Sequence, residues 1–313
     1  MNKSGIKYYI AIARPKDWFK NFFMIPGTII AAVFSKVPLS SFWFVLIIGF
    51  MSTCLISSAN YVLNEWLDSD SDKYHPIKKS RPSVTGNLNP FWVYAEYIIF
   101  SVVGILLARM VSLRFLLASV LFIIMGILYN VKPFRTKDIA FLDVITESFD
   151  NPIRLILGWT VVTSNSLPFL SLLLIYWTGG AFLMNVKRYS EFRFIKNHDL
   201  AVAYRKSFKY YNQKRLLIST FLYANFACFF IGIFLVKYRI ELLLSLPAIA
   251  ILFTWYFYLS FKPNSATQRP EYLLRERLFM FYVFLVIILI ILLMFVNIPA
   301  LHYFLYNEFI PTR

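Results

Sequence analysis

Three side chains with oxygen atoms, Asn64, Asp68 and Asp72, recur at every fourth residue. On a helix this spacing places them along one stripe that rises about 12 Å. Carboxylate and amide oxygens suit Mg²⁺, which usually binds one or two carboxylates together with substrate phosphates. The stripe therefore predicts a site for Mg²⁺ and a diphosphate, with Asp68 and Asp72 as catalytic metal ligands. A solvated helix end would carry the same residues, and that interpretation stays open.

Basic residues follow the stripe at once, among them Lys79 and Arg81. Cations at this position can bind the oxygens of a phosphate substrate, so we expect Lys79 and Arg81 to contact substrate. A positively charged loop on the cytoplasmic side of a membrane would look the same.

A second polar cluster, Lys187-Arg188-Tyr189-Ser190-Glu191, ends a later apolar run. Two cations, a phenol and a carboxylate in five residues can bind phosphate oxygens. We expect Lys187, Arg188 and Tyr189 to bind substrate and Glu191 to be catalytic. The alternative is a basic loop whose long side chains extend to the membrane surface.

Two further segments carry cations beside aromatic residues. The first contains Tyr129, Lys132 and Arg135, which we expect to bind substrate; an ordinary basic loop is an equally good explanation. The second is Arg14–Asn21, an amphipathic stretch suited to the membrane interface. From this stretch we expect Lys20 to reach the substrate.

Four ionisable residues fall within one apolar run, 139–163, at offsets that share a helix face: Asp143, Glu147, Asp150 and Arg154. Charged groups inside a membrane span are costly, and they usually pair or face a wet cavity. We expect Glu147 and Asp150 to be catalytic and Arg154 to bind substrate. Asp150 and Arg154 are also spaced to form an ion pair, and Asn151-Pro152 predicts a kink. The alternative is a set of ion pairs that only locks helix packing.

The elements that must position these residues are apolar runs. Of the 313 residues 59% are hydrophobic, and nine runs approach the ~20 residues that cross a bilayer. They are 20–35, 41–63, 91–108, 113–131, 139–163, 167–186, 216–236, 241–261 and 278–296. The sequence predicts an all-α polytopic membrane protein: one domain over 1–313, with nine transmembrane helices and a cytoplasmic interfacial segment at 1–19.

The charge distribution predicts the orientation. Most of the 32 Lys and Arg residues fall in segments on the same side as the N-terminus. The opposite segments hold Lys36, Arg109, Arg114, Lys237, Arg239 and Arg313. By the positive-inside rule the N-terminus and the active site face the cytoplasm, and the C-terminus faces outward. The +16 net charge then reflects topology and anionic lipid, and we expect no nucleic-acid partner.

At this point the chain resembles a known family. Asn64-x-x-x-Asp68-x-x-x-Asp72 after the second of nine spans is similar to the motif Asn-Asp-x-x-Asp-x-x-x-Asp of the UbiA superfamily of intramembrane prenyltransferases, with Glu65 in place of the first acid. Members bind an isoprenoid diphosphate through Mg²⁺ at two aspartate-rich motifs, after helices two and six. The resemblance implies Mg²⁺ as cofactor.

The second motif departs from the paired aspartates of typical members. The Lys187–Glu191 cluster resembles the decaprenyl-phosphate phosphoribosyltransferase branch, as do the pattern in Arg14–Asn21 and His75-Pro76 with its following Lys79, Arg81 and Pro82. This resemblance implies transfer of phosphoribosyl from phosphoribosyl diphosphate to a polyprenyl phosphate lipid, with release of diphosphate.

Two other functions stay open. One is a prenyltransferase of the same superfamily that uses a polyprenyl diphosphate donor and an aromatic acceptor. The other is a transporter or lipid-binding membrane protein, although the short outer segments offer few polar groups for access from that side. High Lys, Asn, Phe and Ile usage points to an AT-rich genome, and we expect a bacterial inner-membrane protein.

Overall fold

The computed structural model describes residues 5–263, 265–268 and 270–305, and this part of the chain is helical with no strand. Residues 1–4 of the predicted interfacial segment, and Arg313, lie outside it. The α-helices are α1 (Ile6–Ile12), α2 (Ile25–Ser35), α3 (Trp43–Leu67), α4 (Ser69–Asp72), α5 (Pro82–Thr85), α6 (Pro90–Val111), α7 (Leu113–Asn130), α8 (Leu142–Ser148), α9 (Asp150–Val162), α10 (Leu170–Ile195), α11 (His198–Tyr204), α12 (Gln213–Tyr238), α13 (Leu246–Leu259), α14 (Arg277–Phe295) and α15 (Pro299–Leu305).

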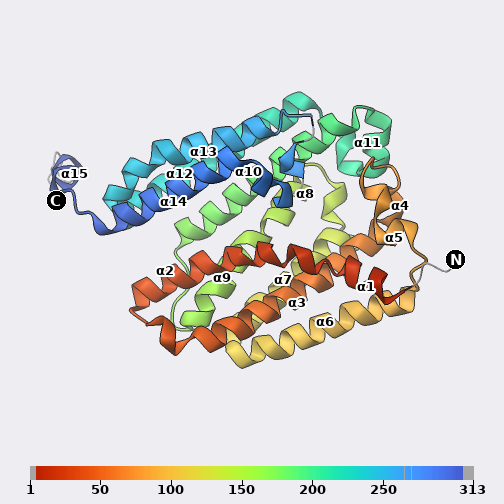
Figure 1. Ribbon diagram of the computed structural model, residues 1–313, viewed down its shortest axis with the longest axis horizontal. Coiled ribbons are helices and arrows are strands. Elements are labelled where there is room, and N and C mark those ends of the chain that lie inside the picture. The colour runs from red at the N-terminus through yellow and green to blue at the C-terminus, as the bar shows by residue number, and fades with distance from the viewer. Residues whose placement is uncertain (1–4, 264, 269, 306–313) are drawn as a thin grey trace.

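The long helices run along the long axis of the molecule, and the short helices α4, α5 and α11 gather at one end (Figure 1). Eight helical segments of the described chain are long and apolar enough to cross a membrane, starting with 6–35. The prediction of an all-helical membrane protein is confirmed. Helix α1 lies at the end that holds the short helices and α15 lies at the opposite end (Figure 1).

The predicted fifth span, 139–163, is not one helix, so the count of nine long helices is not met by the described residues. It consists of α8 and α9, with the break at Phe149. Pro152 has no N–H to donate to the carbonyl of Ser148, four residues earlier. The Asn151 side chain donates to that carbonyl instead, at 3.1 Å. The helix is therefore interrupted at Phe149, two residues before the predicted kink at Asn151-Pro152.

The helix starts follow local chemistry. Asn89, Ser112 and Asn212 cap the starts of α6, α7 and α12, and their side-chain oxygens accept backbone N–H groups at 2.8 to 3.1 Å. These bonds satisfy donors that the first turn of a helix leaves without partners. Polar caps thus mark where the apolar runs begin.

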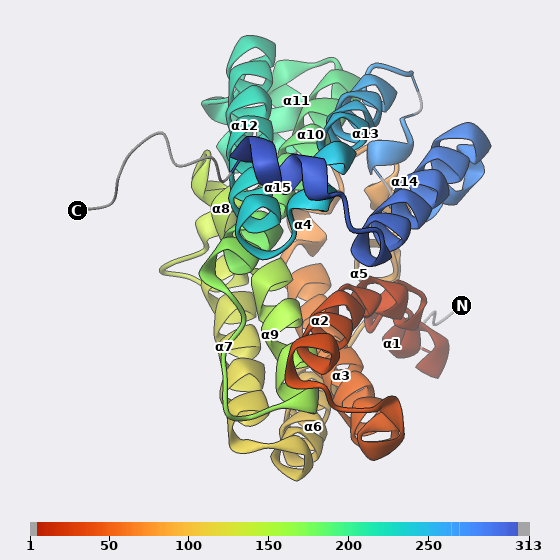
Figure 2. The same ribbon diagram turned by 90° about the vertical axis from the view of Figure 1, so that its left-hand side faces the viewer.

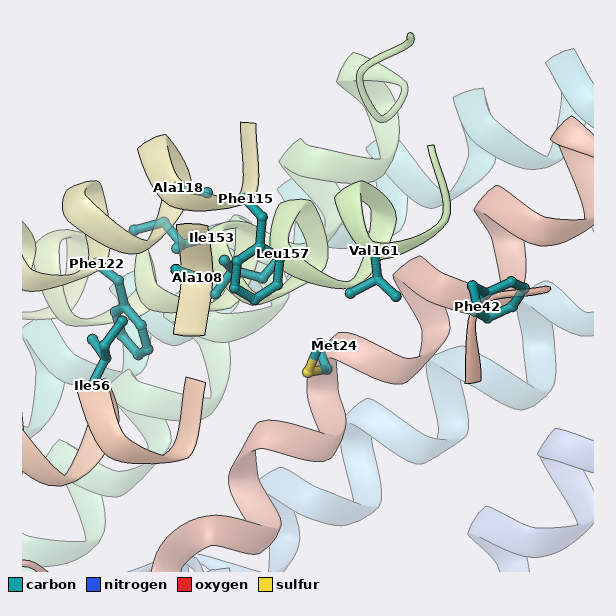
Figure 3. Packing of buried hydrophobic residues seen from close by; sticks show 10 residues of the cluster. All are labelled: Met24, Phe42, Ile56, Ala108, Phe115, Ala118, Phe122, Ile153, Leu157 and Val161. Atoms are coloured by element: carbon teal, nitrogen blue, oxygen red, sulfur yellow. The ribbon is translucent and has the colours of Figure 1, made fainter. Parts of the chain in front are cut away.

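The helices form two groups, one around α3, α6 and α7 and one around α10, α12 and α13 (Figure 2). Helix α9 packs in the first group against α2, α3 and α7 and also contacts α10. The largest buried apolar cluster lies in the first group and includes Met24, Ile56, Phe115, Phe122 and Leu157 (Figure 3). Because α8 and α9 contact both groups, the break between them lies where the groups meet.

Two glycines let α2 and α9 approach closely. A Cβ atom on Gly158 would lie 1.9 Å from the Met24 carbonyl oxygen, and one on Gly27 would lie 2.4 Å from the Leu155 carbonyl oxygen. Thr28 donates to the Gly158 carbonyl at 3.0 Å across the same contact. Only glycine permits this backbone-to-backbone distance, so the helix crossing depends on both residues.

We expect Gly158→Ala to lower the free energy of unfolding by about 1–3 kcal/mol, because the methyl group must push two backbones apart. Gly232→Ala in α12 is the matched control, since a Cβ there meets nothing within 4 Å. The control should unfold at the same temperature as the unchanged protein or slightly higher, because alanine is the better helix former. Thermal unfolding in detergent measures both; equal midpoints would contradict the prediction.

Candidate active site

The predicted Asn64–Asp68–Asp72 stripe lies at the end of α3. Helix α3 ends at Leu67, but backbone hydrogen bonds from Asp68 to Asn64 and from Asp72 to Asp68 continue the four-residue step into α4. The Asn64 amide donates to Asn130 Oδ1 at 2.6 Å. Asn64 is thereby tied to the end of α7, and the stripe faces the segment that follows α7.

Asp68 is surrounded by cations from that segment. Its Oδ1 atom accepts Arg135 Nη2 at 3.1 Å and forms an ion pair with Lys137. Burial opposes the charged form of Asp68, but Lys137, Arg205 and Arg135 outweigh it and hold the pKa of Asp68 below its usual value. Burial also lowers the pKa of Lys137 to about 8, against the opposing effect of Asp68. The carboxylate is therefore charged and ready to bind a cation.

Asp72 and Asp70 differ sharply. The buried Asp72 accepts Arg81 Nη1 at 2.5 Å through its Oδ2 atom, and burial raises its pKa although Arg81 opposes the shift. The Asp70 side chain is 93% exposed and contacts only Lys73. Asp72, a member of the stripe, is therefore buried, whereas the neighbouring Asp70 lies on the surface.

The aspartates fit a Mg²⁺ ion that is held largely by phosphate oxygens. The described residues contain no group of three His, Cys, Asp or Glu side chains placed to hold a metal ion. Among the described residues, the ion pairs of these aspartates run through Oδ1 of Asp68 and Oδ2 of Asp72. Mg²⁺ typically takes one or two carboxylates and completes its shell with water and phosphate.

A cavity of about 460 Å³ opens beside Asp68, between the ends of α3 and α7 and the α11 region. Its wall combines Asp68 with basic side chains of two segments: Lys132, Arg135, Lys137, Arg205 and Lys206. Such a concentration of positive charge attracts a polyanion and gives its phosphates several donors.

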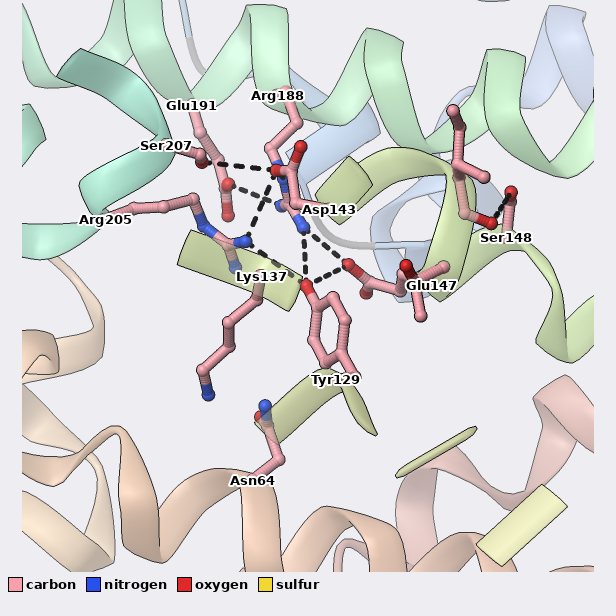
Figure 4. A network of polar contacts seen from close by, with 12 residues as sticks. Asn64, Tyr129, Lys137, Asp143, Glu147, Ser148, Arg188, Glu191, Arg205 and Ser207 are labelled. Carbon is pink, nitrogen blue, oxygen red and sulfur yellow. Dashed lines mark hydrogen bonds and ion pairs between the residues drawn. The ribbon is translucent and has the colours of Figure 1, made fainter. Parts of the chain in front are cut away.

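Arg188 is the centre of a second, buried cluster (Figure 4). Its guanidinium contacts Glu191 at 3.0 Å, Glu147 at 2.5 Å and Asp143 at 3.1 Å. Tyr129 donates to Glu147 at 2.5 Å and accepts from Arg188 at 3.1 Å. The structure thus brings together four residues that the sequence analysis chose from three different segments: Tyr129, Glu147, Arg188 and Glu191.

Asp143 holds the other side of this cluster. It accepts Tyr211 at 2.6 Å and Ser207 at 3.3 Å, and Arg205 lies 3.5 Å away. Arg205 also donates to Tyr129 at 3.2 Å and lines the 460 Å³ cavity. Arg205 therefore connects the cavity beside Asp68 to the cluster around Arg188.

Lys78 joins the loop after α4 to this cluster. It contacts Glu191 at 2.8 Å and the Tyr204 hydroxyl, and burial lowers its pKa although Glu191 opposes the shift. Lys79, the residue chosen from the sequence, is exposed. The loop makes a turn in which the His75 ring accepts the backbone N–H of Lys78, and this turn directs Lys78 rather than Lys79 inward.

Several chosen residues lie apart from both clusters. Arg154 is buried in the bundle, where it donates to Asn21 at 3.1 Å and lies over the Phe122 ring. Among the described residues no ion pair within 4.0 Å joins Asp150 and Arg154, although the charge of Arg154 still acts on Asp150. The contacts of Arg154 with Asn21 and Phe122 place it among the first group of helices.

The remaining residues take varied positions. Lys20 contacts Asp17 at 3.3 Å and the Tyr61 ring at 5.5 Å. Lys187 is half-buried, and Lys132 is exposed on the cavity wall. Tyr189 is buried and packs on the rings of Phe257 and Phe261.

Glu65 does not join the aspartates. It is buried, and Arg14 holds it at 2.6 Å. Successive helix positions point about 100° apart, so the acid next to Asn64 faces the N-terminal segment instead of the cavity.

Four residues of the two clusters were not predicted from the sequence: Lys78, Asn130, Tyr204 and Arg205. Asn130 lay in a segment that was already singled out, while Tyr204 and Arg205 lay in a long basic loop without a distinctive spacing. Only the folding of α11 back over the end of α10 brings these two residues to the cluster.

Comparison with known proteins adds the family context. The model of the UbiA prenyltransferase family matches residues 24–285. Decaprenyl-phosphate phosphoribosyltransferase from Mycolicibacterium smegmatis is 27% identical over 219 residues, and that of Mycobacterium tuberculosis is 26% identical over 214. These alignments cover 68% and 65% of this chain, and each covers 65% of its relative's length.

Solved structures share the fold. A UbiA homolog from Archaeoglobus fulgidus, bound to DMAPP and Mg²⁺, superposes with a TM-score of 0.67 at 19% identity and covers 90% of this chain and 99% of its own. A digeranylgeranylglyceryl phosphate synthase structure superposes with a TM-score of 0.62 at 17% identity, with coverage of 92% and 96%. At these low identities, the two structures show that the chain shares their fold.

We expect Arg188→Ala to destabilise the protein by about 3–5 kcal/mol, because it leaves three acidic side chains, two of them fully buried, without their shared partner. Arg193→Ala on the same helix is the matched control, since Arg193 donates to the Phe261 carbonyl and lies over the Tyr189 and Phe261 rings, and no ion pair with an acid is formed by it among the described residues. Thermal unfolding in detergent compares them. A loss no larger for Arg188→Ala than for Arg193→Ala would contradict this account of the cluster.

Proposed function

The chain belongs to the UbiA prenyltransferase family, and from that premise we propose that it transfers phosphoribosyl from phosphoribosyl diphosphate to a polyprenyl phosphate, releasing diphosphate. The matched relatives that carry a phosphoribosyltransferase name support this choice, although this chain aligns with only 65% of their length. The proposed enzyme is embedded in the membrane and depends on Mg²⁺.

The observation that carries the proposal is the continuous polar wall from Asp68 to Arg188. Phosphoribosyl diphosphate has phosphates at both ends and hydroxyls between them, so its site needs two cationic regions joined by polar groups. Arg135 and Lys137 lie at one end, Arg188 at the other, and Arg205 between them. A prenyl diphosphate would place an apolar chain where this wall offers charge.

Each group has an assigned role in the proposed reaction. Asp68 and Asp72 would hold Mg²⁺, with Asn64 beside them, and the bound ion would supply positive charge to the leaving diphosphate. Arg135 and Lys137 bind the diphosphate oxygens, while Lys132 and Arg81 reach the same side. Lys187 and Lys20 extend the cationic surface.

The chemical step exchanges one bond at C1 of the ribose. A phosphate oxygen of the lipid forms a bond to C1 as the bond from C1 to the diphosphate oxygen breaks and its electron pair leaves with diphosphate. The lipid phosphate is already an anion, so no strong general base is required. Glu147 and Glu191 stabilise positive charge at C1 and accept the ribose hydroxyls, and Tyr129 and Arg188 keep both carboxylates in place. Asp150 remains a candidate for the same role from the start of α9.

A direct assay tests the donor. Purified protein is incubated with radiolabelled phosphoribosyl diphosphate and polyprenyl phosphate, with and without Mg²⁺, and the lipid is extracted. We expect label in the lipid only with Mg²⁺. Efficient transfer from farnesyl or geranylgeranyl diphosphate to an aromatic acceptor, with no reaction of phosphoribosyl diphosphate, would favour the prenyltransferase alternative.

We expect Asp68→Asn and Asp72→Asn each to reduce turnover by at least about 100-fold, since each variant loses a metal ligand that stabilises the leaving group. Asp70→Asn is the matched control, because that exposed side chain contacts only Lys73. The control should keep near-normal turnover in the radiolabel assay at saturating Mg²⁺. Activity in all three variants would refute the proposed metal site.

We also propose that the end carrying α4 and α11 is cytoplasmic. Single cysteines are introduced at Ser80, Asn197 and Ser164, all exposed, in a background with Cys54 and Cys228 replaced. In intact cells an impermeant maleimide should label only the Ser164 position, and the other two should need opened cells. The reverse pattern would invert the topology.

A further inference from the structure

Arg154 is a buried cation that none of the proposed reaction steps uses. It lies in α9, where every residue from 152 to 161 except Ile156 is buried, and it is itself only 7% exposed. Within the described chain no carboxylate oxygen lies within 4.0 Å of its guanidinium, and the charge of Asp150 acts from beyond that distance. A charged group inside a membrane bundle usually has an ion-pair partner or faces a wet cavity. Arg154 has no such partner, so its surroundings indicate a cavity.

Neutral groups hold the Arg154 guanidinium in place. Its Nε atom donates to Asn21 Oδ1 at 3.1 Å, and its central carbon lies 4.8 Å from the centre of the Phe122 ring. The Asn21 amide also accepts Ser57 Oγ at 2.9 Å and donates to Cys54 Sγ at 3.3 Å, so α3 fixes its orientation. An amide and an aromatic ring thus orient the guanidinium without supplying a negative charge.

The two Nη atoms of Arg154 are available to a ligand. They donate no hydrogen bond within the described chain, and both keep some surface open to water. Helix α9 is in contact with α2, α3, α7 and α10, so this opening faces the interior of the bundle rather than lipid. The planar pair of Nη groups matches the spacing of phosphate oxygens and can bind two of them at once.

Polar contacts on α3 lead from Arg154 towards the predicted metal site. Asn60 lies one turn before Asn64, and its amide donates to the carbonyl of Phe122, whose ring lies against Arg154. Ser57, which binds the amide that orients Arg154, precedes Asn64 by seven residues and therefore lies about 10 Å deeper on the same helix face. The Arg154 position is thus the inner end of a polar line that starts at the stripe.

The start of α9 provides a second connection. The charges of Arg154 and Glu147 both act on the Asp150 carboxyl, and Glu147 contacts Arg188. Arg188 is already shared by three acidic side chains, whereas no acid contacts the Arg154 fork within the described chain. Of these two buried arginines, Arg154 is the one with donors left for an anion.

We propose that the Nη groups of Arg154 bind a phosphate monoester inside the bundle. The inference rests on the proposed function and names the residue that binds one of its phosphates. Both substrates of the proposed reaction carry such a group: the 5-phosphate of phosphoribosyl diphosphate and the phosphate of the polyprenyl lipid. The ligand chemistry is the same in both cases, and the experiments below distinguish the two sources.

Thermal unfolding with phosphate probes tests the site without relying on turnover. Full-length protein in detergent is heated with ribose 5-phosphate or farnesyl phosphate, and with ribose or farnesol as the uncharged counterparts. A ligand that binds only the folded state stabilises it, so we expect at least one phosphate, and neither counterpart, to raise the unfolding temperature. The increase should disappear in Arg154→Met and persist in Arg109→Met, the matched change at an exposed position of α6. The phosphate whose effect disappears is the one that Arg154 binds.

Two results of this experiment overturn the proposal. One is that neither phosphate stabilises the unchanged protein. The other is that the phosphates stabilise Arg154→Met as much as the unchanged protein.

The stability of the unliganded variants separates ligand binding from a purely structural role. An apolar side chain of similar length removes the cost of burying an unpaired cation, so Arg154→Met without ligand should unfold at the same temperature as the unchanged protein or higher. If Arg154 only locks Asn21 and Phe122 together, Arg154→Met unfolds at a lower temperature while phosphate stabilisation is unchanged, and the proposal fails.

Arg154→Lys keeps the charge without the planar fork, and it replaces Arg154→Met if that variant does not fold. It should bind the phosphate probe at least about tenfold more weakly than the unchanged protein, because charged hydrogen bonds are lost. Equal affinity would overturn the proposal.

Kinetics identify the source of the phosphate and separate the two proposals. In the radiolabel assay, Arg154→Lys should raise the KM at least about tenfold for the substrate whose phosphate Arg154 binds, and leave the other KM unchanged. Normal values of both KM in a variant that transfers phosphoribosyl would overturn the Arg154 assignment alone. If the protein transfers no phosphoribosyl but a phosphate probe still stabilises it through Arg154, the binding site stands and only the proposed reaction fails.

Discussion

The ion pairs of Arg188 are the contacts on which the polar half of this structure depends. One guanidinium, fully buried near the end of α10, holds Asp143 and Glu147 of α8 and Glu191 of its own helix. Three acids in so small a volume would repel one another without it, and removing them from water is tolerable only because each has a partner. The position of α8 against α10 follows from this arrangement.

As the Arg188 ion pairs position α8 against α10, the interruption between α8 and α9 affects where α9 and its residues lie. A continuous helix would carry Arg154 on the face of Glu147 and bring a further cation to the Arg188 cluster. Because Pro152 cannot complete the helical hydrogen bond to Ser148, α9 turns to pack against α2, where Gly27 and Gly158 allow close contact. Arg154 then binds Asn21 among apolar side chains.

The aspartates and the cations around them form ion pairs in which the opposite charges offset each other. Arg135 and Lys137 hold Asp68, and Arg81 holds Asp72. Under the proposed reaction these cations can also bind diphosphate oxygens. The acids hold these cations in place, and under the proposed reaction they would also bind metal.

The sequence by itself determined the helical membrane fold and the approximate positions of most apolar spans, although α10 continues to Ile195, the first apolar segment covers 6–35, and the fifth span is two helices. These depend on local patterns: apolar length, polar caps, and the four-residue spacing of Asn64, Asp68 and Asp72. Tertiary structure decided which side chains of those segments meet. Lys78 rather than Lys79 reaches Glu191 because a turn at His75 directs it inward, and Arg205 joins the site because α11 folds back over α10. Such choices depend on contacts between residues far apart in the chain, which no local spacing records.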